Sequence, residues 1–420
     1  MKHSYWKTLV LGLGYFGVSG AWATYNAFVP IFLAGRFQLG PAQIGLIMAL
    51  DNVAALLIQP PVGAWSDRVR TPFGRRIPFV LVGAPLAAAV LGVIPAATGL
   101  PLFLVSAVGF LLSMAFWRAP FFTLLADLVP SARRSQANGI INAIGVTGAM
   151  AAFFLGAQLY TIDPAYPFWM GAGILLLTAA LVVLFLREMS VPGPHAEQRD
   201  GILTTIRKVT RDPDGSMLRI MFAILLVFVS NNALDTFVTL YAVNHLGLTA
   251  ADGSRLMGQF TVLFVLFAIP AGVLGARGGR NLSIQAGMMT MAAATLVQYF
   301  LPPAQLAQPL GSLPLIGVVR GVSLTMMLTA VGWCIVFTNS LPMVLDMTTP
   351  AYVGTYVGLY YLFSTLGAII GPIANGWIIE LAGSNYNVML LLGPVLLLCA
   401  VVLMRGVRGG EVARAAPLPA

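Results

Sequence analysis

The stretch QPPVGAWSDRVRTPFGRRIPF, residues 59–79, lies between two long apolar runs. Its ionisable side chains are Asp67, Arg68, Arg70, Arg75 and Arg76. Short loops that carry an excess of arginine and lysine stay on the cytoplasmic side of a membrane. The stretch therefore predicts a cytoplasmic turn between two membrane-spanning helices.

Working outward from this turn, we find twelve apolar runs of about twenty residues, the length that crosses a bilayer as a helix. They are centred near Phe16, Ala54, Ala88, Leu112, Ala149, Leu175, Val229, Phe264, Met291, Thr329, Leu366 and Leu396. Of the 420 residues, 58% are hydrophobic and 9% are charged, so a water-soluble enzyme is nearly excluded. The sequence predicts an all-α membrane protein with twelve transmembrane helices.

Basic residues indicate the orientation of this layout. With the N-terminus inside, about 19 of the 23 Lys and Arg residues fall on cytoplasmic segments. We therefore expect a multi-pass protein of the cell (inner) membrane with both termini cytoplasmic. The net charge of +9 suits this orientation better than binding to nucleic acid. Cys334 and Cys399 both lie in apolar runs, so neither a disulfide framework nor a thiolate metal site is expected.

The longest polar stretch divides the chain into two halves. We expect a six-helix half at 1–186, a cytoplasmic loop at 187–216, and a second six-helix half with a short tail at 217–420. Sparse internal matches support this division, because a shift of 209 places Gly63 on Gly272, and a shift of 219 places Asp127 on Asp346. Residues 204–219 form either a short amphipathic helix or a solvated linker.

The turn at 59–79 resembles the signature loop of the major facilitator superfamily. Its form QPxxGxxSDR…FGRRxPF resembles plant sucrose carriers and related glycoside–pentoside–hexuronide cation symporters, as does the segment from Arg118 to Gly139. The resemblance implies two pseudo-symmetric halves and proton symport of a disaccharide or related glycoside. Gln59 stands where the melibiose-type branch has a cation-binding Asp, which speaks against sodium coupling of that kind.

The charges of the turn suit a gating role. Asp67 can accept hydrogen bonds from a neighbouring helix N-terminus, and the arginines can pair with nearby carboxylates. Gly63 permits close helix approach. We expect a gating set made of Gly63, Asp67, Arg68, Arg75, Arg76, Asp127 and Arg134. The alternative is that these charges only fix topology.

Four charged residues lie well inside apolar runs, where each costs about 2.5 to 3.5 kcal/mol on insertion scales. They are Asp51, Arg118, Asp235 and Arg320. Counting along the helices places Asp51 and Arg118 within reach of each other, either as a coupling pair or as a static buried pair. Because burial favours a neutral carboxyl group, Asp235 is the first candidate proton carrier and Asp51 the second, unless Asp235 only holds helices together. Arg320 is either a donor to solute hydroxyls or a partner of Asp235.

Sugar binding needs planar polar groups and an aromatic face. Besides Arg118 and Arg320, we expect a solute site formed by Trp22, Tyr25, Asn26, Asn52, Asn231, Asn232, Tyr356 and Tyr360. The alternative for the aromatic residues is helix packing or anchoring at the membrane interface.

These features predict a secondary transporter that moves a small polar solute, most simply a sugar, by proton-coupled symport through alternating access. The alternative is a proton-coupled drug or metabolite exporter of the same fold. An enzyme is not expected, because no HExxH, GxSxG or GxxxxGK[ST] motif occurs. We expect no cofactor and no metal. The expected partners are the solute, the proton and the lipid bilayer, with the protein acting as a monomer.

Overall fold

The computed structural model describes residues 5–130, 133–186, 214–314, 316–348 and 352–410. The first half contains α1 (Tyr5–Gly35), α2 (Pro41–Arg68), α3 (Ile77–Val93), η1 (Ile94–Ala96), α4 (Leu100–Leu128), α5 (Arg134–Tyr160) and α6 (Tyr166–Phe185). The second half contains α8 (Ser216–Asn244), α9 (Ala250–Gly278), α10 (Arg280–Phe300), α11 (Pro303–Ala307), β1 (Pro309–Leu313), β2 (Gly317–Arg320), α12 (Gly321–Asp346), α13 (Val353–Leu381), η4 (Tyr386–Val388) and α14 (Met389–Arg405).

All twelve predicted runs are helical, and the all-α fold is confirmed. Ten of the described helices have the length and hydropathy of a membrane span. The two other long helices, α1 and α10, fall below that hydropathy because they carry many glycine and polar residues. Both are nevertheless long enough to cross a bilayer, at 31 and 21 residues. Most of the expected loop at 187–216, and with it most of 204–219, lies outside the described residues.

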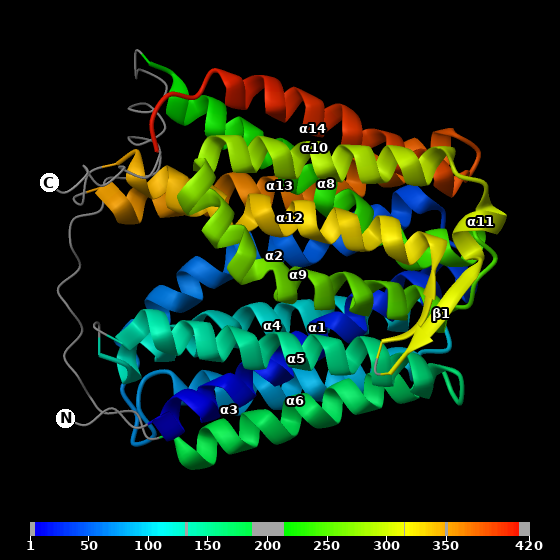
Figure 1. Cartoon of the computed structure of the whole chain (residues 1–420). Helices are drawn as coiled ribbons and strands as arrows, with labels where there is room; N and C mark the ends of the chain where they lie inside the picture. Colours follow the sequence, from blue (N-terminus) through cyan, green and yellow to red (C-terminus); the bar gives the residue numbers. More distant parts are fainter. Residues whose placement is uncertain (1–4, 131–132, 187–213, 315, 349–351, 411–420) are drawn as a thin grey trace, which may run out of the picture.

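Successive helices run in alternating directions, so the chain has two opposite sides (Figure 1). We call the side where α1 begins and α14 ends the terminal side. The opposite side, which carries the antiparallel pair β1–β2, is the hairpin side. Helices α2 and α9 begin on the hairpin side, and α5 and α13 end there.

The two halves meet mainly along two helix pairs, α2 with α13 and α5 with α9, and α1 also contacts α8 and α9. In both pairs, a hydrogen bond joins the two helices on the hairpin side. The Ala42 amide donates to Glu380 Oε2 at 2.9 Å, and Ser254 Oγ donates to the Phe153 carbonyl at 2.9 Å. A Cβ at Gly45 would lie 2.2 Å from the Pro372 carbonyl oxygen, so the backbones of the two halves touch here.

The apolar core also joins the two halves on the hairpin side. One buried cluster fills the first half and continues into the hairpin-side parts of α8, α9 and α13, whereas a second cluster belongs to the second half alone. On the terminal side, α2, α5 and α13 have open space beside several glycines. No atom lies within 4 Å of a Cβ position at Gly63, Gly139, Gly354 or Gly358. In this conformation the halves are joined on the hairpin side and stand apart on the terminal side.

Close helix approach within the first half depends on Gly148 in α5. A Cβ at this residue would lie 2.1 Å from the Phe16 carbonyl oxygen of α1. We expect Gly148→Ala to lower the unfolding free energy by about 1 to 3 kcal/mol, because backbone atoms must move apart. The measurement is the midpoint of thermal unfolding in detergent. Gly139→Ala, on the same helix, is the control and should leave the midpoint unchanged or raise it, since that site is open. Equal midpoints for the two variants would contradict this packing.

Candidate functional site

Helix α1 lies at the centre of the molecule and contacts α2, α4, α5, α6, α8 and α9. Most of its residues between Thr8 and Leu33 are buried, but Tyr15, Ser19, Trp22 and Asn26 are partly exposed. Their spacing of four, three and four residues places them on one face. Because helices of both halves surround α1, this face lies inside the bundle. Sequence reasoning found Trp22 and Asn26 but missed Tyr15 and Ser19, which the same spacing could have revealed.

The side chain of Arg118, on α4, points toward this face of α1. Its guanidinium carbon lies 5.2 Å from the centre of the Trp22 ring and 5.4 Å from that of the Phe122 ring. The Tyr15 ring packs against Phe122 at 4.7 Å. Aromatic faces stabilise a cation in this position. The Arg118 guanidinium therefore lies between two aromatic rings, and its Nε is buried without a hydrogen-bond partner among the described residues.

One carboxylate, Asp51, interacts with this cation, and a second, Asp235, interacts with Asp51. Asp51, on α2, interacts electrostatically with Arg118 and also with Asp235 on α8 of the other half. Among the described residues no ion pair within 4.0 Å joins Asp51 to Arg118, so the expected pair interacts through space without a direct bond. Asp51 Oδ1 instead accepts the backbone and side-chain N–H groups of Asn52, both at 2.5 Å.

Asp235 is partly exposed and accepts no hydrogen bond from the described residues. The alternative that it only holds helices together therefore has no support here. Of the neighbouring asparagines, Asn232 donates to the Phe228 carbonyl of its own helix at 2.9 Å. Asn231 lines a small cavity inside the second half together with Ser230. Of these residues, Asp235 interacts electrostatically with a charge of the first half, Asp51.

Several buried donors of the first half lack partners. They are the Trp22 Nε1, Tyr25 Oη, Gln59 Nε2, Trp117 Nε1 and Arg118 Nε atoms. Tyr25 is fully buried and stacks on Phe110 at 5.2 Å. A buried donor without a partner costs about 1 to 3 kcal/mol. Hydroxyl-rich groups that reached these donors would recover that free energy.

Arg320 does not belong to this site, which corrects the expectation from sequence. It is the last residue of β2 and lies on the hairpin side, where it donates to the Ala307 carbonyl at 2.8 Å and pairs with Asp252 at 3.5 Å. The valines of β2 extend the tenth apolar run at its start, so Arg320 looked deeper in the membrane than it is.

The expected tyrosine stripe of α13 is split. Tyr360 is 3% exposed, and its hydroxyl shares a 2.9 Å hydrogen bond with Ser340 inside the second core. It therefore packs helices together and does not face a solute in this conformation, which corrects the sequence expectation. Tyr356 is half-buried one turn closer to the terminal side.

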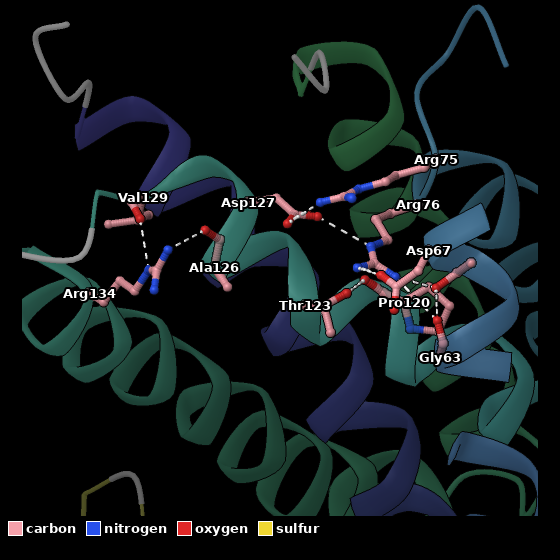
Figure 2. A network of polar contacts seen from close by, with 11 residues as sticks. Gly63, Asp67, Arg75, Arg76, Pro120, Thr123, Ala126, Asp127, Val129 and Arg134 are labelled. Carbon is pink, nitrogen blue, oxygen red and sulfur yellow. Dashed lines mark hydrogen bonds and ion pairs between the residues drawn. The ribbon is translucent and has the colours of Figure 1, made fainter. Parts of the chain in front are cut away.

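The turn after α2 forms a charged network on the terminal side (Figure 2). Arg76, only 5% exposed, binds Asp67 and Ser66 and reaches Asp127 Oδ2 at 3.2 Å. Arg75 binds Asp127 Oδ1 at 2.6 Å. The pairing expected between the loop arginines and Asp127 is present. It connects the end of α2, the start of α3 and the end of α4.

Three members of the expected gating set, Gly63, Arg68 and Arg134, do not form the contacts that the sequence predicted. Gly63 has open space around it, so the close helix approach expected there is absent, and its carbonyl instead accepts from Ser66 Oγ at 2.7 Å. Arg68 is exposed and forms no ion pair with the described residues. Arg134 donates to the Ala126 and Val129 carbonyls at 2.9 and 3.1 Å (Figure 2), and so caps the end of α4 without meeting a carboxylate.

The second half repeats this network in simpler form. Arg280, at the start of α10, pairs with Asp346 at the end of α12. These positions correspond to Arg76 at the start of α3 and Asp127 at the end of α4. Sequence reasoning aligned Asp346 with Asp127 but did not name this pair, although the arginine after Gly279 was visible.

The comparisons with known proteins identify the family. A family model described as Major Facilitator Superfamily matches residues 11–332. The chain belongs to this superfamily. It is a multi-pass membrane transporter and not an enzyme.

Individual relatives of this superfamily member differ in what their names say they carry. "Proton-associated sugar transporter A" of Mus musculus is 39% identical over 84 residues, which are 19% of this chain and 11% of the mouse protein. "Multidrug resistance protein 1" of Bacillus subtilis (strain 168) is 27% identical over 248 residues, which are 56% of this chain and 60% of that protein. The chain thus spans only a small part of the sugar relative.

Solved structures of superfamily members share the fold. The nucleoside transporter NupG has a TM-score of 0.72 at 13% identity and covers 95% of this chain and 98% of its own. An inward-facing, occupied bacterial homologue of the lysosomal transporter Spinster has a TM-score of 0.69 at 15% identity, over 96% and 94% of the two chains. At such identities the likeness establishes the architecture alone.

The network around Asp127 gives a test of local stability. Asp127→Ala leaves the buried Arg76 without its second carboxylate, so we expect the unfolding free energy to fall by about 1.5 to 3 kcal/mol. Thermal unfolding in detergent measures the change. The control is Arg68→Ala, which removes an exposed charge of the same loop and should change the free energy by less than about 0.5 kcal/mol. If Arg68→Ala were the more damaging variant, the network described here would be wrong.

Proposed function

We propose that this chain is a secondary transporter that carries a small polar solute, a sugar or glycoside, by symport with protons. The observation that carries the proposal is the group formed by Asp51, Arg118 and Asp235. Asp51 on α2 interacts with Arg118 on α4 within the first half, and with Asp235 on α8 across the interface between the halves. A site shared by both halves can be opened to each side in turn.

The balance of charge supports protons as the coupling ion. With all three groups ionised, Asp51 and Asp235 would carry two negative charges and Arg118 one positive charge. A net charge deep in the membrane is costly, and uptake of one proton makes the group neutral. Asp235 is the better proton carrier, because Asp51 already accepts two hydrogen bonds from Asn52 whereas Asp235 accepts none from the described residues. Gln59 adds no further carboxylate to attract sodium.

The first half supports a sugar or glycoside as the solute. The rings of Trp22 and Tyr15 can face the C–H surface of a pyranose, and the donors at Trp22 Nε1 and Arg118 Nε can bind hydroxyls or ring oxygens. The short match to a proton-associated sugar transporter agrees with this choice. We place the chain nearest to the glycoside–pentoside–hexuronide and sucrose-carrier group.

Alternating access follows from the asymmetry of the two sides. If the basic loops are cytoplasmic, the terminal side faces the cytoplasm and this conformation is open inward. Residues 1–186 and 217–420 then rock as two bodies joined by the 187–216 loop. We propose that the protein works as a monomer in the cell membrane, with both termini in the cytoplasm.

A proton-coupled exporter is the second candidate. The multidrug resistance relative favours it, because that match covers 56% of the chain, against 19% for the sugar relative. The exporter would use the same carboxylates with the opposite direction of solute movement.

The experiment compares two transport modes in proteoliposomes: accumulation of labelled solute driven by a pH gradient, and exchange of labelled for unlabelled solute. A panel of labelled sugars is tested first. With one proton per solute, a gradient of one pH unit supports about tenfold accumulation. Asp235→Asn mimics the protonated carboxyl, so we expect it to lose accumulation but keep exchange of labelled for unlabelled solute. Asp51→Asn should reduce accumulation less. Asp163→Asn, an exposed carboxylate of the hairpin side, serves as the control.

Two results would count against the proposal. Accumulation by Asp235→Asn at the wild-type level would remove this residue from coupling. Extrusion of drugs with no exchange of any sugar would favour the exporter.

A further inference from the structure

The two helices that begin on the hairpin side at the interface between the halves are capped in different ways. Helix α9 caps itself. The Thr249 hydroxyl accepts from the Asp252 amide at 3.1 Å, and Asp252 accepts from Thr249 in return. Helix α2 has Gly40 at the equivalent position, which has no side chain to cap with. Gln43 accepts only the Gly40 amide, at 3.2 Å.

The missing cap of α2 is supplied by the other half. Glu380, in the last turn of α13, accepts the Ala42 amide through Oε2 at 2.9 Å. A carboxylate stabilises the positive end of a helix dipole, here that of α2. At the negative end of its own helix the same charge is unfavourable. Glu380 is therefore poorly placed for α13 alone and well placed only when the two halves are in contact.

Neighbouring packing fixes this contact. A Cβ at Gly40 would lie 2.8 Å from Glu380 Oε2, and a Cβ at Gly376 would lie 2.4 Å from the Pro41 carbonyl oxygen. The start of α2 and the end of α13 thus fit together without room for further atoms. In the second interface pair, α5 with α9, the hydrogen bond among the described residues is the neutral one from Ser254 to Phe153.

We propose that Glu380 is a gating residue that stabilises the closed hairpin side by capping α2 across the interface. When the halves separate on this side, α2 loses its cap whereas α9 keeps its own. The contact therefore favours the conformation that is open on the terminal side, and its strength sets how often the hairpin side opens. The inference rests on the proposed transport cycle for its role, but its test needs no solute.

The test measures the separation of the halves on the hairpin side. Spin labels are attached at Ile162→Cys of the first half and Leu310→Cys of the second, both exposed, in a background with Cys334 and Cys399 replaced by Ala. Double electron–electron resonance then gives the distribution of distances between the labels. For Glu380→Ala we expect the ratio of long to short distances to rise about fivefold, the effect of losing one helix cap. Glu380→Gln, which keeps a hydrogen bond but loses the charge, should give a smaller rise.

Two controls separate gating from simple helix capping. Asp163→Ala removes a carboxylate that caps the Ala165 amide at 2.7 Å on the same side but within one half, so the distances should not change. Gly40→Ser combined with Glu380→Ala gives α2 a cap of its own, as α9 has. This double variant should recover thermal stability and still show the longer distances.

The proposal is overturned if Glu380→Ala leaves the distances as they are in Asp163→Ala, or if the double variant restores the wild-type distribution. Either result would mean that Glu380 only stabilises the end of α2. A failure to find solute uptake, with the distances shifted as expected, would instead count against the proposed function alone.

Discussion

The arrangement of the charged residues in this protein depends on one physical constraint: charges inside a lipid-embedded helix bundle must be compensated by neighbouring groups. Arg118 meets this constraint with two aromatic rings and with the field of Asp51, and it does so without a direct ion pair. A direct, fully bonded pair would be stable but hard to open. A cation held by rings and by charges at longer range keeps hydrogen-bonding capacity for a solute.

The same constraint explains how the halves are joined. Asp51 and Asp235 lie on different halves, so their electrostatic interaction depends on how the halves are placed relative to each other. On the terminal side, charges are paired within each half, as Arg76 with Asp127 and Arg280 with Asp346. Such pairs make each half rigid without fastening it to the other. The hydrogen bonds described between the halves, from Ala42 to Glu380 and from Ser254 to Phe153, lie on the hairpin side, as the proposed rocking movement requires of one of its end states.

Much of the fold could be predicted from the sequence, because lipid forces apolar runs into helices and all twelve run centres are helical. Asp51, Arg118 and Asp235 were also found, since intramembrane charge is rare. The predictions were wrong where the local sequence pattern did not match the position of a residue in the fold. Arg320 follows a short hairpin whose valines resemble a membrane span, and Tyr360 shares a helix face with Tyr356 but packs inward. Glu380 was missed because its partner is a backbone amide 338 positions away, which no spacing rule reveals.

The central claim is that the polar face of α1 and the charges near it line a water-filled interior. The most direct measurement is the reaction of Asn26→Cys with a charged, membrane-impermeant thiol reagent, in a background without Cys334 and Cys399. Val105→Cys, which is exposed on the outside of α4, provides the lipid-facing comparison. The account predicts rapid labelling of Asn26→Cys and slow labelling of Val105→Cys. An unreactive Asn26→Cys, in every condition that leaves the protein folded, would contradict it.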